Sequence, residues 1–162
     1  MFFKKMKKKK KKIIWNILKG LAILFVIAVL FTILPHLFFN IDTYKVKSEA
    51  TKENYSRMVA YITVEVMTCI MGDTTTMDGN LTCQDRTADS VIAAAVIATK
   101  DVQMNPYELD KSAVTSGGTN TSDSDAGYIR LSVSGVNIII KTCHTKPCAT
   151  NANQRSETIA FQ

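Results

Sequence analysis

The chain has few residues of the kinds that carry out catalysis or hold cofactors. Its two histidines are His36 and His144, and its carboxylates are scattered along the sequence. It lacks the G-x-S-x-G, P-loop, G-x-G-x-x-G and H-E-x-x-H patterns that place nucleophiles, phosphates, dinucleotides and zinc. We therefore expect no enzyme activity, no catalytic residue, no metal site, no cofactor and no small-molecule substrate.

Acidic residues are absent before Asp42, although nine of the twenty basic residues lie in that part of the chain. A basic segment without acids beside an apolar run predicts a cytoplasmic tail over residues 1–19. A polybasic patch on anionic lipid is a compatible interpretation. Nucleic-acid binding is not expected, because no aromatic residue interrupts the lysine run and no basic fold follows it. The basic cluster comprises Lys4, Lys5, Lys7, Lys8, Lys9, Lys10, Lys11, Lys12 and Lys19.

Residues 20–39, GLAILFVIAVLFTILPHLFF, contain no charged side chain. Twenty helical residues rise about 30 Å, which matches the hydrocarbon core of a bilayer. We therefore expect a transmembrane helix, a single-pass membrane anchor and a C-terminal part in the periplasm or at the cell surface. A buried core helix is the alternative, but no other segment is long and apolar enough to cover it. A cleaved signal peptide is a second alternative, but no small-x-small site closely follows the run.

Residues 40–71 predict an amphipathic helical stem that continues the apolar segment. Apolar residues recur there at steps of three and four, which is typical of one buried helical stripe, and Gly72 stands where a helix often ends. No strong helix breaker separates the two segments, and Pro35 more often kinks a membrane helix than ends one. We therefore expect one long helix over residues 20–71. The stripe comprises Tyr55, Met58, Val59, Ile62, Val66, Cys69 and Ile70.

Residues 72–162 predict an extracytoplasmic α+β head with disulfides. Residues 88–104 form a second helical segment that is apolar on most of its faces and is followed by Asn105-Pro106. Residues 109–127 are poor in large apolar side chains and predict an exposed, flexible loop.

Alternating apolar residues predict the strands of this head. They run through residues 129–133 and 136–141, with a tight turn at Ser134-Gly135 between them, and a third strand runs through Ile159 and Phe161. The predicted fold is α+β: a long N-terminal transmembrane-plus-amphipathic helix packed on a second helix and a small three-stranded antiparallel sheet.

The four cysteines, Cys69, Cys83, Cys143 and Cys148, all follow the apolar run. An even number on the expected outer side indicates disulfides in an oxidising compartment. Pairing within each local group predicts Cys69–Cys83 and Cys143–Cys148. A zinc site is the alternative, but it would require C-x-x-C knuckles. A redox site beside His144 would require C-x-x-C at the start of a helix. Neither spacing is present.

The arrangement resembles the type IV pilins and the pseudopilins of type II secretion. The likeness is carried by the 20–71 helix with Pro35 inside it, by Asn105-Pro106-Tyr107 before a variable loop, by the GYIRLSVSGVNIIIKTC hairpin, and by two cysteines near the end. The chain differs from that family at Phe25, where the family carries a glutamate. The resemblance implies a structural subunit that assembles through its N-terminal helix into a filament or pseudopilus.

Two functions follow as expectations. The first is a pilin-like structural subunit that contacts membrane lipid and forms homo- or hetero-oligomers with similar subunits. The second is a non-assembling anchored envelope protein whose head binds a partner or ligand. For assembly, large side chains would face neighbouring helices and small ones would permit close approach. The packing residues expected are Ala22, Leu24, Phe25, Ala28, Phe31 and Pro35.

Overall fold

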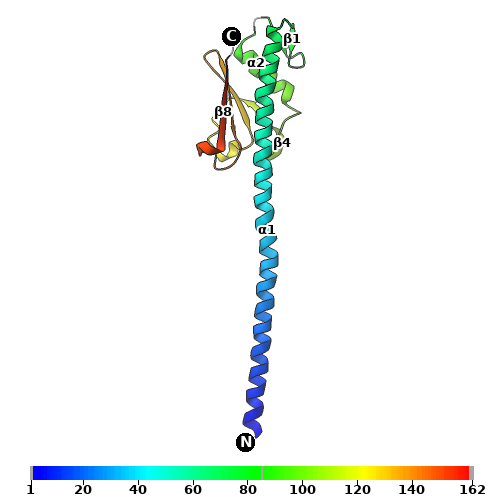
Figure 1. Ribbon diagram of the computed structural model, residues 1–162, viewed down its shortest axis with the longest axis vertical. Helices are drawn as coiled ribbons and strands as arrows, with labels where there is room; N and C mark the ends of the chain where they lie inside the picture. The colour runs from blue at the N-terminus through cyan, green and yellow to red at the C-terminus, as the bar shows by residue number, and fades with distance from the viewer. Residues whose placement is uncertain (1, 85, 161–162) are drawn as a thin grey trace. The chain divides into compact units, whose positions relative to one another are not determined.

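The computed structural model describes the backbone of residues 2–84 and 86–160 (Figure 1). It describes the side chains of residues 20, 21, 23–25, 27–29, 43–84 and 86–160. The chain divides into two compact units, Met1–Thr43 and Tyr44–Gln162. The second unit holds every strand, both disulfides and the described core, so it is the part from which a site can be built.

Helix α1 extends over Phe2–Ile70 and belongs to both units. Its 44–70 part buries most of the predicted stripe, with Met58 and Ile62 fully enclosed, whereas Val59 is half-buried and Ile70 is exposed. Contrary to the expectation for residues 20–39, the described residues contain no helix that is long and apolar enough to cross a membrane.

Helix α2, Ala88–Thr99, begins at a capping box in which Thr87 and Ser90 exchange side chain-to-backbone hydrogen bonds. Val91, Ala94 and Ala95 are buried, as expected for a helix that is apolar on several faces. The helix ends five residues earlier than the sequence predicts. After Thr99 the chain forms a turn in which the backbone N–H groups of Val102 and Gln103 both donate to the carbonyl of Thr99, and Met104 and Asn105 then belong to a strand.

The main sheet has four strands, so the predicted three-stranded antiparallel sheet is wrong. Its order is β5-β6-β7-β8, with β5 parallel to β6 and the other neighbours antiparallel. The predicted hairpin and third strand are present as β6, β7 and β8. The extra strand, β5, is only three residues long and pairs in parallel with a strand more than a dozen residues away, so no local pattern announces it. The strands are Val114–Ser116, Ile129–Ser134, Asn137–Cys143 and Gln154–Ala160.

Two small antiparallel sheets complete the second unit and were not predicted either. Strands β1, Thr75–Thr76, and β2, Leu81–Thr82, close the loop after α1, and β3, Met104–Asn105, pairs with β4, Glu108–Ser112. Short 3₁₀ helices occur at Asp123–Asp125 and Asn151–Asn153. The segment 109–127, expected to be a flexible loop, therefore contains β4, β5 and the first of these turns.

The hydrophobic core lies between α1, α2 and one face of the main sheet. Met58 and Ile62 of α1 pack in one cluster with Val91 of α2 and with Leu131 and Ile140 of the sheet. Each fully buried aliphatic side chain of this kind contributes roughly 1.5–3 kcal/mol. The stripe of α1 and the second helix thus cover the sheet, as the sequence predicts.

Candidate functional site

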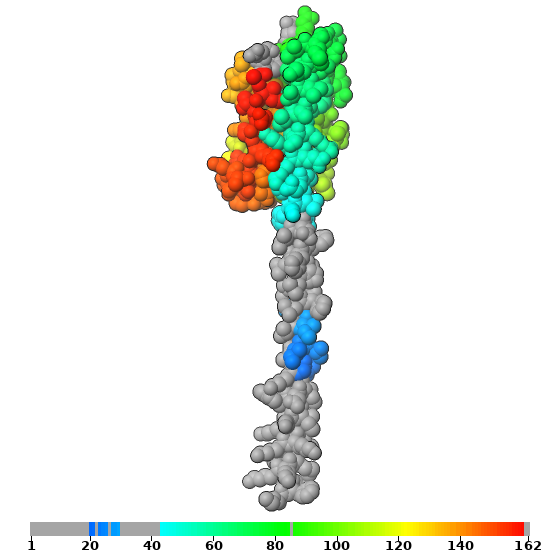
Figure 2. Space-filling view, in the orientation of Figure 1, coloured from blue at the N-terminus to red at the C-terminus, as the bar shows by residue number. Residues whose placement is uncertain are grey.

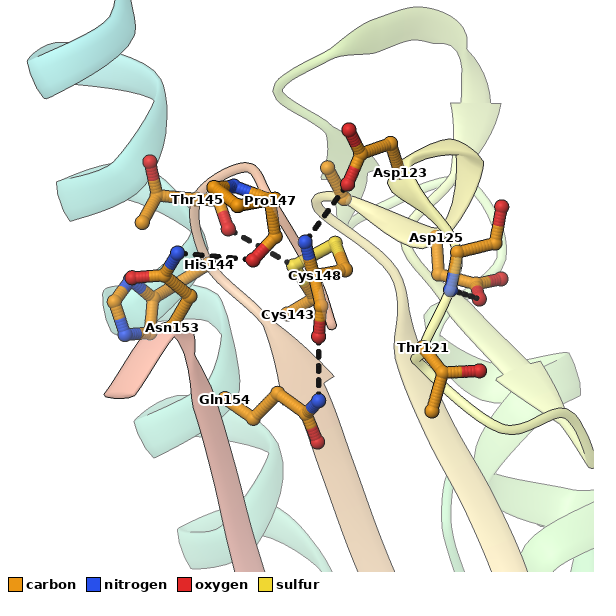
Figure 3. Close-up of a disulfide and its surroundings, with 12 residues drawn as sticks. Thr121, Asp123, Asp125, Cys143, His144, Thr145, Pro147, Cys148, Asn153 and Gln154 are labelled. Atoms are coloured by element: carbon orange, nitrogen blue, oxygen red, sulfur yellow. Dashed lines mark hydrogen bonds between the residues drawn. A yellow bond between two sulfur atoms is a disulfide. The ribbon is translucent and has the colours of Figure 1, made fainter. Parts of the chain in front are cut away.

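The disulfide loop, residues 143–148, is held by polar contacts from Asp123 and from Gln154 (Figure 3). The Cys143–Cys148 bond closes it, and both residues are completely buried. Asp123 Oδ1 accepts a 2.8 Å hydrogen bond from the backbone N–H of Cys148, while Gln154 Nε2 donates to the carbonyl of the same residue. Sulfur atoms without solvent-exposed surface cannot exchange with the thiol of a substrate. The disulfide therefore has a structural role in this loop.

His144 joins the disulfide loop to helix α1. Its Nδ1 lies 3.2 Å from Ser48 Oγ, and both residues are buried although 96 positions separate them. Burial lowers the pKa of His144 below its usual 6.5, and the positive charges of Lys52 and Arg155 act in the same direction. The ring is therefore held as neutral imidazole near neutral pH, in a contact that docks the loop on α1.

Next to the disulfide loop, Gly127 and the side chain of Asn105 lie very close together. The buried Asn105 donates from Nδ2 to the carbonyl of Ala126 at 3.3 Å and accepts from the backbone N–H of Tyr107 at 2.8 Å. The Tyr107 hydroxyl donates to the carbonyl of His144 at 2.9 Å. Asn105 and Tyr107 thus connect β3 to the disulfide loop, which gives a physical role to the Asn-Pro-Tyr segment singled out in the sequence.

The second disulfide joins Cys69 at the end of α1 to Cys83 after β2. The structure thus has the two pairs that the sequence predicts, and none of the four cysteines is free. The zinc alternative has no thiolates to use. Among the described residues, no group of three His, Cys, Asp or Glu side chains is placed to hold a metal ion.

Arg130 on β6 makes partly buried polar contacts that the sequence did not reveal. Its Nη2 donates to Asp125 Oδ1 at 2.8 Å and its Nη1 donates to Thr115 Oγ1 at 2.9 Å. The guanidinium also lies 4.8 Å from the centre of the Tyr128 ring. The segment before β6 is therefore fixed by charge and hydrogen bonding, in place of the large apolar residues that it lacks.

The N-terminal residues singled out in the sequence are only partly described. Leu24, Phe25 and Ala28 lie on α1 with exposed side chains. The side chains of Ala22, Phe31, Pro35 and His36 lie outside the described residues, as do those of the basic cluster, Lys4, Lys5, Lys7–Lys12 and Lys19. Their expected roles in packing and topology stay predictions.

A second apolar stripe runs along α1 on the side away from the core. This outer stripe consists of Ala60, Val64, Met67 and Ile70 of α1 and of Met71, which directly follows the helix and donates its backbone N–H to the carbonyl of Met67. All five are exposed. The exposed fractions of Val64, Met67 and Met71 are 60%, 55% and 76%. Positions 60, 64, 67 and 71 follow the four-three-four spacing of a helix–helix seam. The spacing of the outer stripe is visible in the sequence, but only the buried stripe was predicted from it.

Asn54-Tyr-Ser, Asn80-Leu-Thr and Asn120-Thr-Ser match the acceptor pattern for N-glycosylation, and the structure places the three asparagines in different environments. Asn120 is completely buried, Asn54 lies within α1 and donates to the carbonyl of Met104 at 3.2 Å, and Asn80 is exposed in the turn before β2. An oligosaccharide needs an exposed asparagine in an accessible loop. Of these three positions, Asn80 alone has that environment.

Comparison with known proteins gives no relative for this chain. No protein-family model matches the sequence, and no curated protein and no solved structure is detectably similar to it.

Proposed function

We propose that this protein is an extracytoplasmic structural subunit of the pilin or pseudopilin kind. It is held at a membrane by residues 20–39 and assembles with similar subunits through helix α1. The observation that carries this proposal is the outer stripe of α1. The membrane attachment rests on the sequence, since most side chains of residues 20–39 lie outside the described part.

The outer stripe supports assembly because the second unit does not need it for folding. The core is already covered by the opposite side of α1, through residues such as Met58 and Ile62. The apolar side chains of Val64, Met67 and Met71 are exposed to water, and burying them against another helix would lower the free energy. A stripe with four-three-four spacing packs against a similar apolar stripe on another helix. Helix α1 of a second copy carries such a stripe.

The size of the stripe bears on how much of α1 takes part. A stable interface buries about 800 Å² on each partner, which is more than a few side chains can provide. The N-terminal part of the same helix supplies further exposed apolar residues, including Leu24 and Phe25. In the proposed assembly, both the N-terminal part of α1 and its 44–70 part contact neighbouring subunits. The disulfide-bonded unit is attached to this helix.

Site-specific photo-crosslinking in cells tests the proposal while leaving both disulfides intact. A photoreactive amino acid is placed at 24, 64 or 67, with the exposed loop position 119 as the control. We expect ladders of several subunits from the three helix positions and none from position 119. A monomer band at every position, at native expression level, would favour the non-assembling anchored protein.

A matched pair of substitutions separates assembly from folding. Val64→Lys places a charge in the outer stripe, and Val136→Lys places the same charge at the β6–β7 turn, where the exposed fraction is similar at 67%. We expect Val64→Lys to abolish the crosslinked ladder and Val136→Lys to leave it unchanged. Both variants should keep the near-UV circular dichroism of the folded second unit. Equal ladders from both variants would contradict a role for the stripe.

A further inference from the structure

A group of basic side chains gathers around the contact between α1 and the disulfide loop. We call it the basic collar, and it consists of Lys45, Lys47, Lys52, Lys146 and Arg155. Figure 2 shows the surfaces that carry it side by side, with the first residues of the second unit beside the segment that follows β7.

Backbone and side-chain contacts bring the collar together. Lys52 lies one turn of α1 beyond Ser48, whose Oγ is 3.2 Å from His144 Nδ1, and Arg155 on β8 pairs with Thr142, two residues before His144. The Lys47 ammonium lies 5.6 Å from the centre of the Tyr107 ring, whose hydroxyl donates to the carbonyl of His144. Lys146 belongs to the same disulfide loop and is exposed. Cations from α1, the loop and β8 therefore share one end of the unit.

Among the collar residues, Lys52 alone is held in an ion pair within the described part of the chain, with Glu49 as its partner. Glu49 is engaged by Lys52, with 2.8 Å between Oε1 and Nζ, and Glu108 is engaged by Lys111, with 2.5 Å between Oε2 and Nζ. No carboxylate within the described ranges lies at ion-pair distance from Lys45, Lys47, Lys146 or Arg155. The collar thus leaves positive charge at the surface, where an anionic partner would reach it.

The surroundings of the collar resemble a membrane interface more than a protein- or nucleic-acid-binding face. Tyr44 is exposed beside the collar and lies close enough to Tyr107 to affect the pKa of its hydroxyl. Tyrosine and lysine together are typical of the headgroup layer, where the ring and the alkyl stem stay apolar and the tips stay wet. In the sequence, Lys45 follows the apolar run 20–39 by six residues within the same helix.

We propose that the basic collar binds the anionic headgroups of the membrane to which the chain is attached. This inference rests on the membrane attachment proposed above and adds a second contact to it. The apolar segment would hold the chain at the bilayer, and the collar would hold the disulfide-bonded unit against the headgroups until assembly removes it.

Lysine footprinting on the full chain tests the collar with native residues. The purified protein is reconstituted in vesicles of phosphatidylcholine, with or without added phosphatidylglycerol, and the acetylation rate of each lysine is measured by mass spectrometry. We expect the anionic lipid to slow acetylation of Lys45, Lys47 and Lys146 several-fold. Lys100 and Lys141, which are exposed elsewhere on the unit, serve as internal controls and should not change. Salt near 1 M, where the Debye length is about 3 Å, should remove the difference.

Flotation of the same samples distinguishes the collar from the membrane attachment. If the protein floats with both kinds of vesicle but the collar lysines react equally in both, the collar proposal is overturned and the attachment stands. If the protein does not float, both proposals fall. Protection of the collar by a soluble polyanion such as heparin, without protection by anionic vesicles, would assign the surface to a soluble acidic partner and overturn the lipid proposal.

Discussion

Gly127→Ala offers a quantitative test of the close approach beneath the disulfide loop. Gly127 has φ +85°, in the left-handed region, and a Cβ there would lie 2.0 Å from Asn105 Oδ1 and 2.8 Å from Tyr107 Cδ2. The left-handed conformation costs an L residue about 1–2 kcal/mol. The methyl group must also displace the buried carboxamide of Asn105 and break its hydrogen bonds, at about 1–3 kcal/mol for a buried group left unpaired. Together these effects predict a loss of about 2–5 kcal/mol.

Gly79→Ala is the matched control for this substitution. Gly79 has φ +81°, and no heavy atom lies within 4 Å of its Cβ position. It should therefore cost only the backbone contribution, about 1–2 kcal/mol. The difference between the two variants isolates the contacts of the added methyl group with Asn105 and Tyr107.

Urea unfolding of the full chain in mild detergent measures both variants. Near-UV circular dichroism is a suitable signal, because all five tyrosines follow Thr43 and so report on the second unit. The midpoint should fall much further for Gly127→Ala than for Gly79→Ala at an unchanged slope. In an Asn105→Ala background, part of the extra cost of Gly127→Ala should disappear, because the clashing carboxamide is gone while the close approach to Tyr107 remains. Equal midpoints for the two glycine variants would refute the reasoning.

Two further predictions concern the disulfide-bonded unit. The lowered pKa of His144 means that the folded chain binds this proton less readily than the unfolded chain, so the associated stability is present above pH 6.5 and is lost as pH falls through the folded pKa. His144→Gln should flatten the urea midpoint between about pH 5 and 8, and an unchanged pH profile would count against this contact. Replacing Cys69 and Cys83 together by serine should cost about 2–4 kcal/mol by freeing the loop between them, and an unaltered midpoint would contradict it.

Sequence patterns identified the parts of the fold that repeat locally. The stripe through Met58 and Ile62 recurs at helical spacing, and the strands beside Ser134-Gly135 alternate with a turn between them. The cysteine pairs could be predicted for the same reason, since each pair closes a short stretch of chain. These features need only neighbours in sequence to be recognised.

Elements that depend on distant partners were not predictable in this way. Strand β5 has three residues and exists because it pairs in parallel with β6. Helix α2 ends at Thr99, and Met104, which the sequence placed in this helix, instead pairs with β4 as part of β3. The contact of Ser48 with His144, and that of Asn105 with Gly127, join segments whose spacing carries no signal.

The burial of the sulfur atoms has a consequence for how the protein is made. Cys143 and Cys148 have no exposed surface, and Cys69 and Cys83 have almost none. An oxidising enzyme must reach a thiol directly, so it would have to act while the chain is still open. A chain that closed its core in the reduced form would keep its thiols out of reach until it opened again. Oxidation and core closure would therefore be ordered events, and the pace of thiol oxidation relative to folding would set the yield of mature protein.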